Sequence, residues 1–430
     1  MRGTNGAITL RTERTERTEP AARTRAWLTA DVWFIALSAF CADLGYQGVL
    51  AVFPLFLVLR LHAPVALFGL ATALAYGPGA LSGYIGGRVG DRAGRKRTAL
   101  WGNALIPLLA LTGLAGSAAE AVALLAAGWW ARNFRSPPRR AMLTEVVAPA
   151  DQGKAFGFLH ALDIGGGTLA ALYAFVLVDL AVPYRTVLLI TLLPLVASTV
   201  VLAFTRAGRG RPAAGAGAAP TTQPSAARPP AGGKLAVYRG VLVATALYGF
   251  SSYSAGFPIL TVARGTRPAY GVLAYVIFLG VSALTGLWAG RLGGDPVRRL
   301  SLLGYLAGGV GSAGFALSYA LRLGLAGFYP AMAVLGFALG VVETLEPTLI
   351  ARLAPASRTS GGMGSLTASR SVGLFVANIA LGLLYHLSPV LSYGYATVMA
   401  AAAAVLLLGV GRRHAAADTF GGGAGASSAV

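Results

Sequence analysis

The sequence predicts an all-α polytopic membrane protein with twelve transmembrane helices, arranged as two six-helix bundles that repeat one another. Three observations support this fold class. Of the 430 residues, 56% are apolar and only 12% are charged, whereas soluble domains carry roughly 25% charged residues. The apolar residues gather into about twelve runs, each near the roughly 20 residues that a bilayer-spanning helix needs. Basic residues lie mostly between these runs, where they determine which way the helices face.

The first half of the chain contains six apolar runs behind a polar tail. An Arg-Thr-Glu triplet repeats through residues 11–19. A helix would stack its arginines along one stripe, so residues 1–26 are expected to form a disordered cytoplasmic tail. Residues 27–205 are expected to form the N-terminal bundle, with helices over residues 32–59, 64–87, 98–118, 121–147, 155–179 and 184–205.

A stretch rich in Ala, Gly, Pro and Thr separates the two halves and lacks apolar periodicity. Residues 206–235 are therefore predicted to be a flexible cytoplasmic linker. Residues 412–430 end in a Gly/Ala/Ser run and are predicted to form a second disordered cytoplasmic tail. Between them, residues 236–411 are expected to form the C-terminal bundle, with helices over residues 236–262, 268–290, 300–321, 325–351, 361–386 and 390–411.

Composition also excludes several classes of function. A net charge of +20 would suggest nucleic acid for a soluble protein. Here the basic residues lie between apolar runs, so we expect lipid headgroups, and no nucleic acid, as their partners. Cys41 is the single cysteine and the four histidines are scattered, so no metal site or cofactor is predicted. No phosphate-binding loop and no nucleophile–base pair is apparent, and we expect no enzyme activity.

The distribution of basic residues predicts the orientation of the chain. With the N-terminus inside, the outer loops hold few basic residues, namely Arg60, Arg185, Arg264, Arg267 and Arg322. The opposite loops hold many more, and short basic loops stay on the cytoplasmic side. We therefore expect both termini in the cytoplasm of a prokaryote-like cell and a multi-pass protein, monomeric, in the inner or plasma membrane.

The loop over residues 87–97 reads GRVGDRAGRKR and lies between the second and third apolar runs. It resembles the Gly-x-x-x-Asp-Arg-x-Gly-Arg-Lys signature between helices 2 and 3 of the major facilitator superfamily. The matching positions are Gly87, Asp91, Arg92, Gly94, Arg95 and Lys96. This resemblance is closest to bacterial drug- and metabolite-efflux members and covers roughly residues 28–411. It implies two six-helix bundles that work by alternating access.

The second half repeats features of the first half. Residues 290–295 read GRLGGD, a worn copy of the loop after the second run, and they follow the eighth run. Residues 147–150 read VAPA and recur as LAPA at residues 353–356, each time after the fourth run of a half. A parallel repeat of six plus six helices is typical of this superfamily.

The resemblance also implies roles for the loop residues. A carboxylate at a helix end can interact with the positive end of another helix dipole. In the family, the residue matching Asp91 contacts the start of helix 11, which in this chain is expected at residues 360–362. The residue matching Arg95 pairs with an acid near the end of helix 4, for which Glu145 is the candidate. Both contacts would close the cytoplasmic side.

Ionisable residues inside the spans of the first half are candidates for the solute and proton pathway. Asp43 lies roughly 17 Å along the first span, near the middle of the bilayer core. Arg132, Arg135 and Arg139 share one face of the fourth span. We expect Arg132 and Arg135 to neutralise Asp43 and Asp163, while Arg139 also matches Asp163 in depth.

In the second half the signs are exchanged. Glu343 and Glu346 stand on the tenth span, and Arg370 stands on the eleventh at a similar depth. Two acids facing one arginine would leave one carboxylate without a partner, and such a carboxylate holds a proton readily in a low dielectric. Glu343 or Glu346 is therefore the candidate proton carrier, with Asp43 next.

Together these patterns predict a secondary active transporter of a small molecule. Tyr46 and Gln47 follow Asp43 by one turn and can contribute hydrogen bonds to a substrate. The favoured mechanism is proton-coupled antiport for efflux. One alternative is an importer, symporter or facilitator of an anionic metabolite bound by the arginine face of the fourth span. A non-transporting membrane scaffold is a third interpretation, disfavoured because a scaffold needs no balanced charges at midplane depth.

Overall fold

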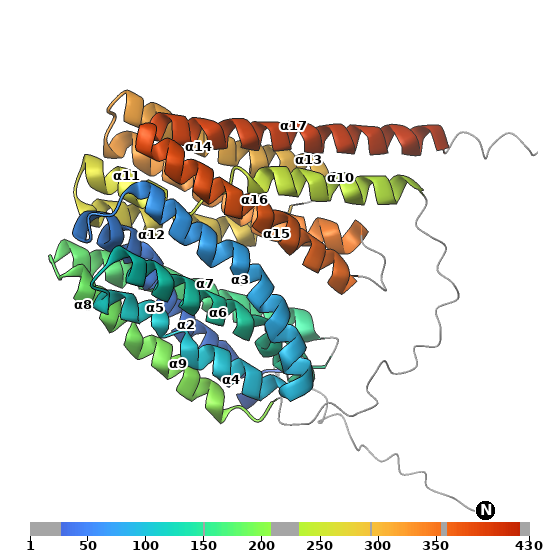
Figure 1. Ribbon diagram of the computed structural model, residues 1–430. Helices are drawn as coiled ribbons and strands as arrows, with labels where there is room; N and C mark the ends of the chain where they lie inside the picture. Colours follow the sequence, from blue (N-terminus) through green and yellow to red (C-terminus); the bar gives the residue numbers. More distant parts are fainter. Residues whose placement is uncertain (1–26, 149–150, 208–231, 293–294, 354–358, 422–430) are drawn as a thin grey trace, which may run out of the picture.

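The chain is described from a computed structural model that covers residues 27–148, 151–207, 232–292, 295–353 and 359–421 (Figure 1). The regular structure in these residues is helical throughout. The predicted tail over residues 1–26 and most of the predicted linker lie outside the described residues.

The first half folds into six hydrophobic segments. Pro107 lies in a short break in the third segment, and Ser117 caps the start of the fourth segment together with Glu120. The elements are α2 (Ala30–Leu55), the π-helix η1 (Phe56–Arg60), α3 (Val65–Ala93), α4 (Arg95–Leu105), α5 (Leu108–Leu111), the 3₁₀-helix η2 (Thr112–Leu114), α6 (Ala118–Val146), α7 (Gln152–Asp179), α8 (Tyr184–Ile190) and α9 (Leu192–Phe204).

The second half repeats this plan with a different set of breaks. Its first segment is interrupted over residues 250–255, where the sequence pattern predicts one continuous helix. The elements are α10 (Gly232–Gly249), α11 (Gly256–Gly265), α12 (Pro268–Ala289), α13 (Pro296–Arg299), the π-helix η4 (Leu300–Leu306), α14 (Ala307–Ala320), α15 (Leu325–Leu353), α16 (Thr359–Leu387) and α17 (Pro389–Gly421). The last helix runs beyond the predicted boundary at residue 411.

Nine helical stretches in the described part of the chain are long and apolar enough to cross a membrane. The other three segments differ for physical reasons. The stretches over residues 95–114 and 232–265 are divided into shorter helices, and α6 carries several arginines in its interior. The arrangement nevertheless corresponds to twelve membrane-crossing segments, six in each half.

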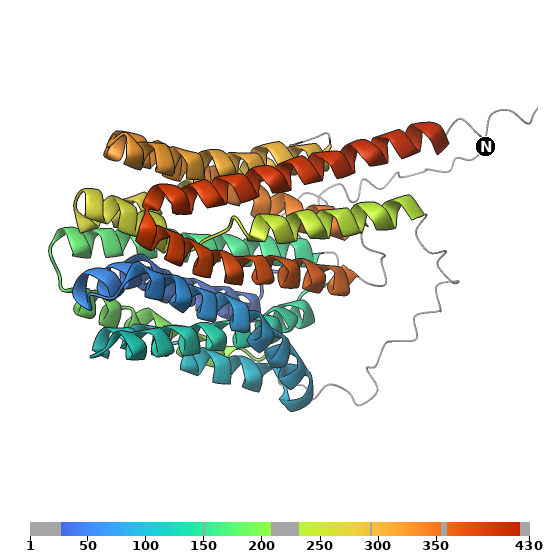
Figure 2. The ribbon, with the colours of Figure 1, turned by 45° about the horizontal axis from the view of Figure 1, so that its top comes forward.

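The two halves form two bundles that lie side by side (Figure 2). Across the boundary, α3 packs on α16, α7 on α12 and α2 on α11. We call the end that carries residues 93–95, 207, 232, 353 and 359 the linker end, and the opposite end, with residues 61–64 and 180–183, the hairpin end. The bundles lie together at the hairpin end and diverge toward the linker end (Figure 1).

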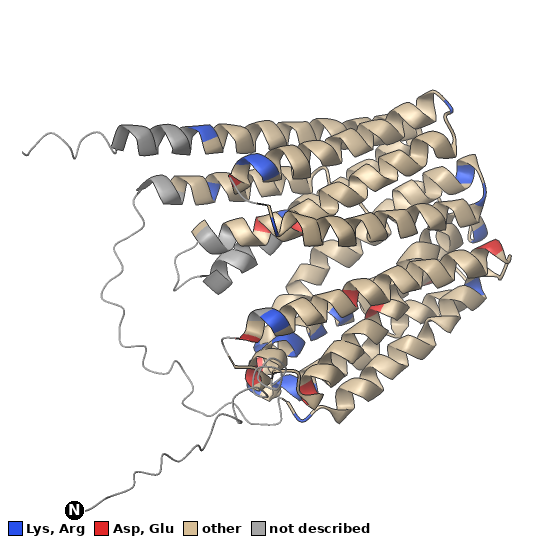
Figure 3. Cartoon of the chain, turned by 180° about the vertical axis from the view of Figure 1, so that it is seen from behind, with Lys and Arg blue, Asp and Glu red and all other residues tan. Residues whose placement is uncertain are grey.

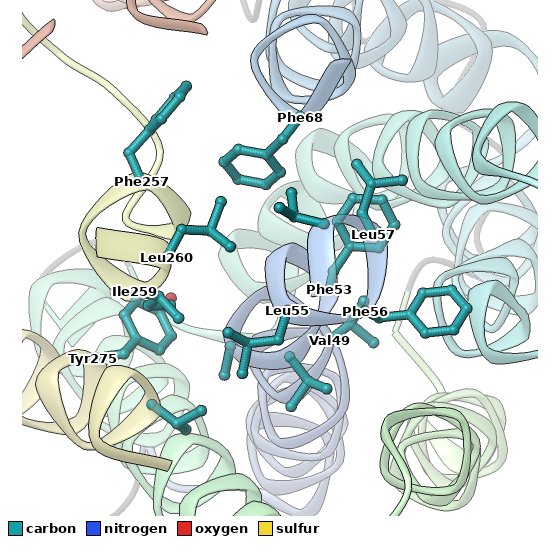
Figure 4. Close-up of a cluster of buried hydrophobic side chains, with 14 of the residues drawn as sticks. Val49, Phe53, Leu55, Phe56, Leu57, Phe68, Phe257, Ile259, Leu260 and Tyr275 are labelled. Atoms are coloured by element: carbon teal, nitrogen blue, oxygen red, sulfur yellow. The ribbon is translucent and has the colours of Figure 1, made fainter. Parts of the chain in front are cut away.

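The buried apolar side chains follow the same division. At the hairpin end one cluster contains residues of both bundles, including Phe53, Phe68, Phe257 and Tyr275 (Figure 4). The Phe68 and Phe257 rings lie 5.1 Å apart, centroid to centroid. At the linker end each bundle has its own separate cluster. Among the described residues, the bundles therefore share an apolar cluster at the hairpin end, whereas the clusters at the linker end belong to one bundle each.

Candidate functional site

A cavity of about 290 Å³ lies between the two bundles. The break between α10 and α11, residues 251–256, forms one wall. Tyr76 of α3 and Tyr275 of α12 line its sides, and Glu343 of α15 and Arg370 of α16 complete the lining. Irregular backbone is tolerated at membrane depth where it borders such a cavity. The cavity is therefore lined by hydroxyl, aromatic and charged groups.

The serine-rich wall was missed by the sequence prediction, although a signal was present. Residues 251–254 read SSYS in the middle of an apolar run. Side chains of this type satisfy freed backbone groups in the structure, since Ser251 and Ser252 both donate to the carbonyl of Tyr248. A polar run inside a predicted span is thus a marker of a broken helix.

The acids and the arginine of the second bundle meet as a trio. Arg370 Nη1 donates to Glu343 Oε1 over 2.7 Å, and Arg370 Nη2 lies 3.3 Å from Glu346 Oε2. The Glu343 side chain is 51% exposed where it lines the cavity, whereas Glu346 is fully buried. The prediction that one glutamate lacks a partner is wrong, because the two guanidinium nitrogens divide between the acids. The trio still carries one more acid than base.

One aromatic hydroxyl, that of Tyr305, binds the buried acid on the side away from Arg370. Tyr305 Oη donates to Glu346 Oε1 over 2.7 Å, and the same hydroxyl lies 3.0 Å from Thr245 Oγ1. The Tyr248 ring stacks on the Tyr305 ring, with centroids 4.2 Å apart. Tyr248 also lines the cavity. A continuous set of polar groups thus connects the cavity wall with the interior of the bundle.

In the first bundle, Asp43 and Arg132 are joined through a tyrosine. Tyr46 Oη donates to Asp43 Oδ1, and Arg132 Nη2 donates to Tyr46 Oη over 2.9 Å. The guanidinium also lies over the rings of Tyr46 and Trp129, at 4.5 and 4.7 Å from their centroids. The expected direct pairing of Arg132 with Asp43 is thus replaced by a relay. Tyr46 is 2% exposed, with its hydroxyl engaged in this relay.

Arg135 has another partner than expected, whereas Arg139 meets the acid that it matches in depth. Arg135 is fully buried and donates to Asn103 Oδ1 over 2.5 Å, which corrects its predicted pairing with an acid. Arg139, expected nearer water, is buried and lies 3.7 Å from Asp163 Oδ2. The sequence did not single out Asn103, because one amide in a mostly apolar run forms no motif with its neighbours.

The two bundles therefore hold comparable pairs with opposite signs. Arg139 of α6 faces Asp163 of α7, and Glu343 of α15 faces Arg370 of α16. In each bundle the pair joins the fourth and fifth segments. The exchange of signs was visible in the sequence, and the structure brings both pairs into contact.

Polar contacts also cross the boundary between bundles. Tyr275 Oη donates to Gln47 Oε1 over 2.6 Å. Thr72 Oγ1 and the backbone N–H of Ser254 each lie 3.0 Å from Asn378 Oδ1. Gln47 was predicted as a site residue, whereas Asn378 was missed. Tyr275, which makes the first of these contacts, both lines the cavity and belongs to the shared apolar cluster.

The sequence predicts a loop over residues 87–97, but the structure makes this stretch mostly helical. Residues 87–93 end α3, residues 95–97 begin α4, and Gly94 alone links them at the linker end. We keep the name motif loop for residues 87–97.

Arg95 Nη1 bonds to Glu145 Oε1 over 2.5 Å, which brings the predicted pair together. Asp91 forms an ion pair of 3.7 Å with Arg95, and its side chain is 70% exposed. The side chains of residues 360–362 lie outside what the structure describes, so the expected contact of Asp91 with the start of α16 stays a prediction. Lys96 Nζ donates to the carbonyl of Ala203 over 2.8 Å, at the end of α9.

The glycines and the remaining arginine of the motif have simpler positions. Gly94 links α3 to α4 with a φ of +98°, a conformation that favours glycine. A Cβ on Gly87 would lie 3.6 Å from Pro137, so this glycine borders α6. Arg92 is exposed in the last turn of α3. Figure 3 shows charged residues gathered at this end of the molecule.

Among the described residues, no group of His, Cys, Asp or Glu is arranged to hold a metal ion. The residues that line the cavity offer hydroxyl groups, a carboxylate and a guanidinium for hydrogen bonds and ion pairs.

The chain is similar to known membrane transporters in sequence pattern and in fold. The family model described as Major Facilitator Superfamily matches residues 35–378. No curated protein matches the sequence. A solved peptide transporter, in complex with sulfate, superimposes with a TM-score of 0.70 at 16% identity, covering 89% of this chain and 94% of that one.

Two further solved structures have the same fold. A D-xylose–proton symporter gives a TM-score of 0.70 at 15% identity, over 89% of this chain and 97% of that chain. The nucleoside transporter NupG gives a TM-score of 0.69 at 11% identity, over 88% and 98% of the two chains. At these identities the likeness concerns the fold.

Proposed function

The chain belongs to the major facilitator superfamily, and from this premise we propose that it exchanges a small solute for protons through the cavity beside Arg370. Membership makes it a multi-pass secondary transporter rather than an enzyme. The proposal depends on one observation. Glu343 lines the cavity and at the same time binds Arg370. A solute and a proton would then compete for one carboxylate, which is what antiport requires.

The charge of the trio supports proton binding. Glu343, Glu346 and Arg370 together hold one excess negative charge when both acids are ionised. A net charge is costly in the low dielectric of a membrane protein interior. One proton shared by the two acids removes it. Asp43, which accepts from Tyr46 in the first bundle, is the second candidate carrier.

The direction follows from the basic residues of the linker end. Short loops rich in Lys and Arg face the cytoplasm, so this end would be cytoplasmic, with both termini inside the cell. Because, among the described residues, the bundles share an apolar cluster at the hairpin end and not at the linker end, the structure would be the inward-facing state. A solute would enter from the cytoplasm and leave on the other side, in exchange for a proton.

In this proposal the motif loop closes the linker end during the other half of the cycle. Asp91 is exposed here and would find its partner at the start of α16 once the bundles approach. The residues that would form this gate are Gly87, Asp91, Arg92, Gly94, Arg95, Lys96 and Glu145. The site of action would be the inner or plasma membrane, with surrounding lipid as partner and one chain as the working unit.

A second candidate is symport of an anion with a proton. The favouring observation is that Arg370 lines the cavity beside Glu343. A proton on Glu343 would weaken the ion pair and free guanidinium donors for an anionic solute. Proton and solute would then bind together, and transport would run inward. The D-xylose–proton symporter with the same fold shows that this fold can serve symport.

The test measures internal pH in proteoliposomes with an imposed proton gradient, while lipophilic cations, organic anions and divalent metals are added in turn. A solute that discharges the gradient only when protein is present would establish coupling, and the sign of the pH change separates antiport from symport. Glu343→Gln should abolish the proton flux, by at least about tenfold, because an amide cannot exchange a proton at this pH.

The matched control is Glu120→Gln. Glu120 caps the start of α6 at the hairpin end, far along the chain from the trio, and glutamine can make the same capping contact. This variant should keep the parent's flux. Equal proton flux in Glu343→Gln and the parent would disprove the role of Glu343.

A further inference from the structure

A second cavity, of about 520 Å³, lies at the hairpin end where the bundles meet. Three arginines line it: Arg60 at the end of η1, Arg185 in α8 and Arg267 at the start of α12. One acid, Asp179 at the end of α7, completes its charged lining. Arg267 belongs to the second bundle and the other three to the first, so the cavity crosses the boundary.

The charges in this cavity do not balance. Three arginines and one aspartate line the cavity, all of them exposed, so the lining residues carry two excess positive charges. Like charges held in one cavity repel one another unless a counter-charge enters. The guanidinium is a planar fork of donors that matches the oxygens of phosphate and carboxylate groups. The lining therefore has the chemistry of an oxyanion site.

Existing contacts hold two of the three arginines without using all their donors. Arg185 Nη2 donates to the carbonyl of Ala115 over 3.0 Å. Arg267 Nη2 lies 3.6 Å from Asp179 Oδ1, an ion pair that is longer than a hydrogen bond. Since each guanidinium has five N–H donors, these two side chains can still bind an anion.

We propose that this cavity binds an oxyanion, a phosphate or carboxylate group, and that the bound anion strengthens closure of the hairpin end. An anion held by Arg60 and Arg185 of one bundle and Arg267 of the other connects the two. A ligand that binds one conformation more tightly shifts the population toward it. This inference does not depend on the proposed solute or coupling ion.

The first experiment uses inorganic phosphate as the probe. The full chain in phosphatidylcholine nanodiscs is titrated with phosphate by calorimetry, with chloride keeping the ionic strength constant. We expect saturable binding that weakens at least about tenfold in Arg60→Gln/Arg185→Gln and in Arg267→Gln. The matched control is Arg264→Gln, which removes an exposed arginine at the end of α11 outside the cavity lining and should leave the affinity unchanged.

The second experiment asks whether the anion is a lipid headgroup. Melting temperature is compared in phosphatidylcholine nanodiscs with and without phosphatidylglycerol. A rise that disappears in the same variants, without binding of free phosphate, assigns the cavity to the lipid phosphate. The proposal is overturned if neither phosphate nor phosphatidylglycerol has an effect that depends on Arg60, Arg185 or Arg267. If the double variant does not fold, Arg267→Gln alone decides.

Closure has its own measurement. In a Cys41→Ser background, Ser252→Cys places a thiol in the central cavity, and a water-soluble thiol reagent added at the hairpin end measures access to it. Bound phosphate or anionic lipid should slow this labelling severalfold. Binding without any change in labelling would overturn the effect on closure.

Discussion

At the scale of single residues, Arg370 connects two acids in different surroundings. Glu343 borders the cavity and is half exposed, whereas Glu346 is fully buried and held by Tyr305. Removing the shared arginine should lower the free energy of unfolding much more than replacing one acid by its neutral amide. Without the arginine, a charged acid stays buried and has no cation beside it. The two kinds of substitution should therefore separate stability from transport.

Arg370→Gln should lower the free energy of unfolding by about 3–5 kcal/mol at neutral pH, because it leaves two acids close together without a cation. Protonation of either acid relieves this cost, so the variant should regain stability as the pH falls. Glu346→Gln should change stability by about 1 kcal/mol or less, since Arg370 keeps Glu343. Thermal melting in detergent between pH 5 and 8 measures both.

The parent chain and Glu346→Gln serve as references in that series. The difference in melting temperature between the parent and Arg370→Gln should become smaller as the pH falls. If it stays the same, the two acids have found other partners in the variant.

At the scale of elements, the turn between α3 and α4 decides where the motif residues lie. Gly94 has a φ of +98°, and a Cβ at this residue would meet no atom within 4 Å. Glycine is thus favoured here by the positive φ of the backbone, whereas the surroundings have room for a larger side chain. The turn directs α4 so that Arg95 reaches Glu145 of α6 and Lys96 reaches the end of α9.

Gly94→Ala should destabilise the chain by about 1–2 kcal/mol, because an L-residue is strained at positive φ. The matched control is Gly157→Ala, which lies within α7 and also has open space around a Cβ. There alanine should stabilise the helix by up to about 1 kcal/mol. Equal melting temperatures for the two variants would argue against backbone strain at Gly94.

The Arg95–Glu145 pair should show a coupling energy of about 0.5–1 kcal/mol, because the two side chains are only partly buried. A double-mutant cycle with Arg95→Gln and Glu145→Gln, read by thermal melting, measures it. The coupling should shrink in high salt. Strictly additive effects would mean that the 2.5 Å contact contributes nothing to stability.

At the scale of the whole molecule, closure of the hairpin end depends on backbones that approach closely. A Cβ on Gly69 of α3 would overlap the carbonyl oxygen of Asn378 and would lie 2.8 Å from Cα of Gly382, both on α16. Small residues permit such contact between membrane helices. The shared apolar cluster lies at this same end (Figure 4).

Gly69→Leu should therefore force the hairpin end apart and shift the population to the opposite state. With Ser252→Cys in the Cys41→Ser background, the central cavity should become about tenfold more reactive to a thiol reagent added at the hairpin end. Gly394→Leu is the control, because a Cβ there meets no atom within 4 Å. Unchanged labelling in Gly69→Leu would mean that α3 and α16 can separate without opening the cavity.

Much of the candidate site could be predicted from the sequence, because charges inside apolar runs stand out. A charged side chain is costly to place in the bilayer core, so such residues are recognisable in the sequence. They are Glu343, Glu346, Arg370, Asp43, Arg132 and Asp163. Their partners were harder to predict. Arg135 and Arg139 lie one turn apart on one face of α6, so the pattern fits either as the partner of Asp163. The hydrogen bond from Arg135 to Asn103 follows only from the packing of α4 beside α6.

The sequence by itself determined the class of protein, its segments and its family, because hydrophobic length and the motif of residues 87–97 depend only on local composition. The tertiary structure alone decided which side chains meet, where the cavity lies and which end is closed. These depend on contacts between segments far apart in the chain, such as Thr72 with Asn378. Local patterns carry no information about the packing of two bundles that can adopt more than one arrangement.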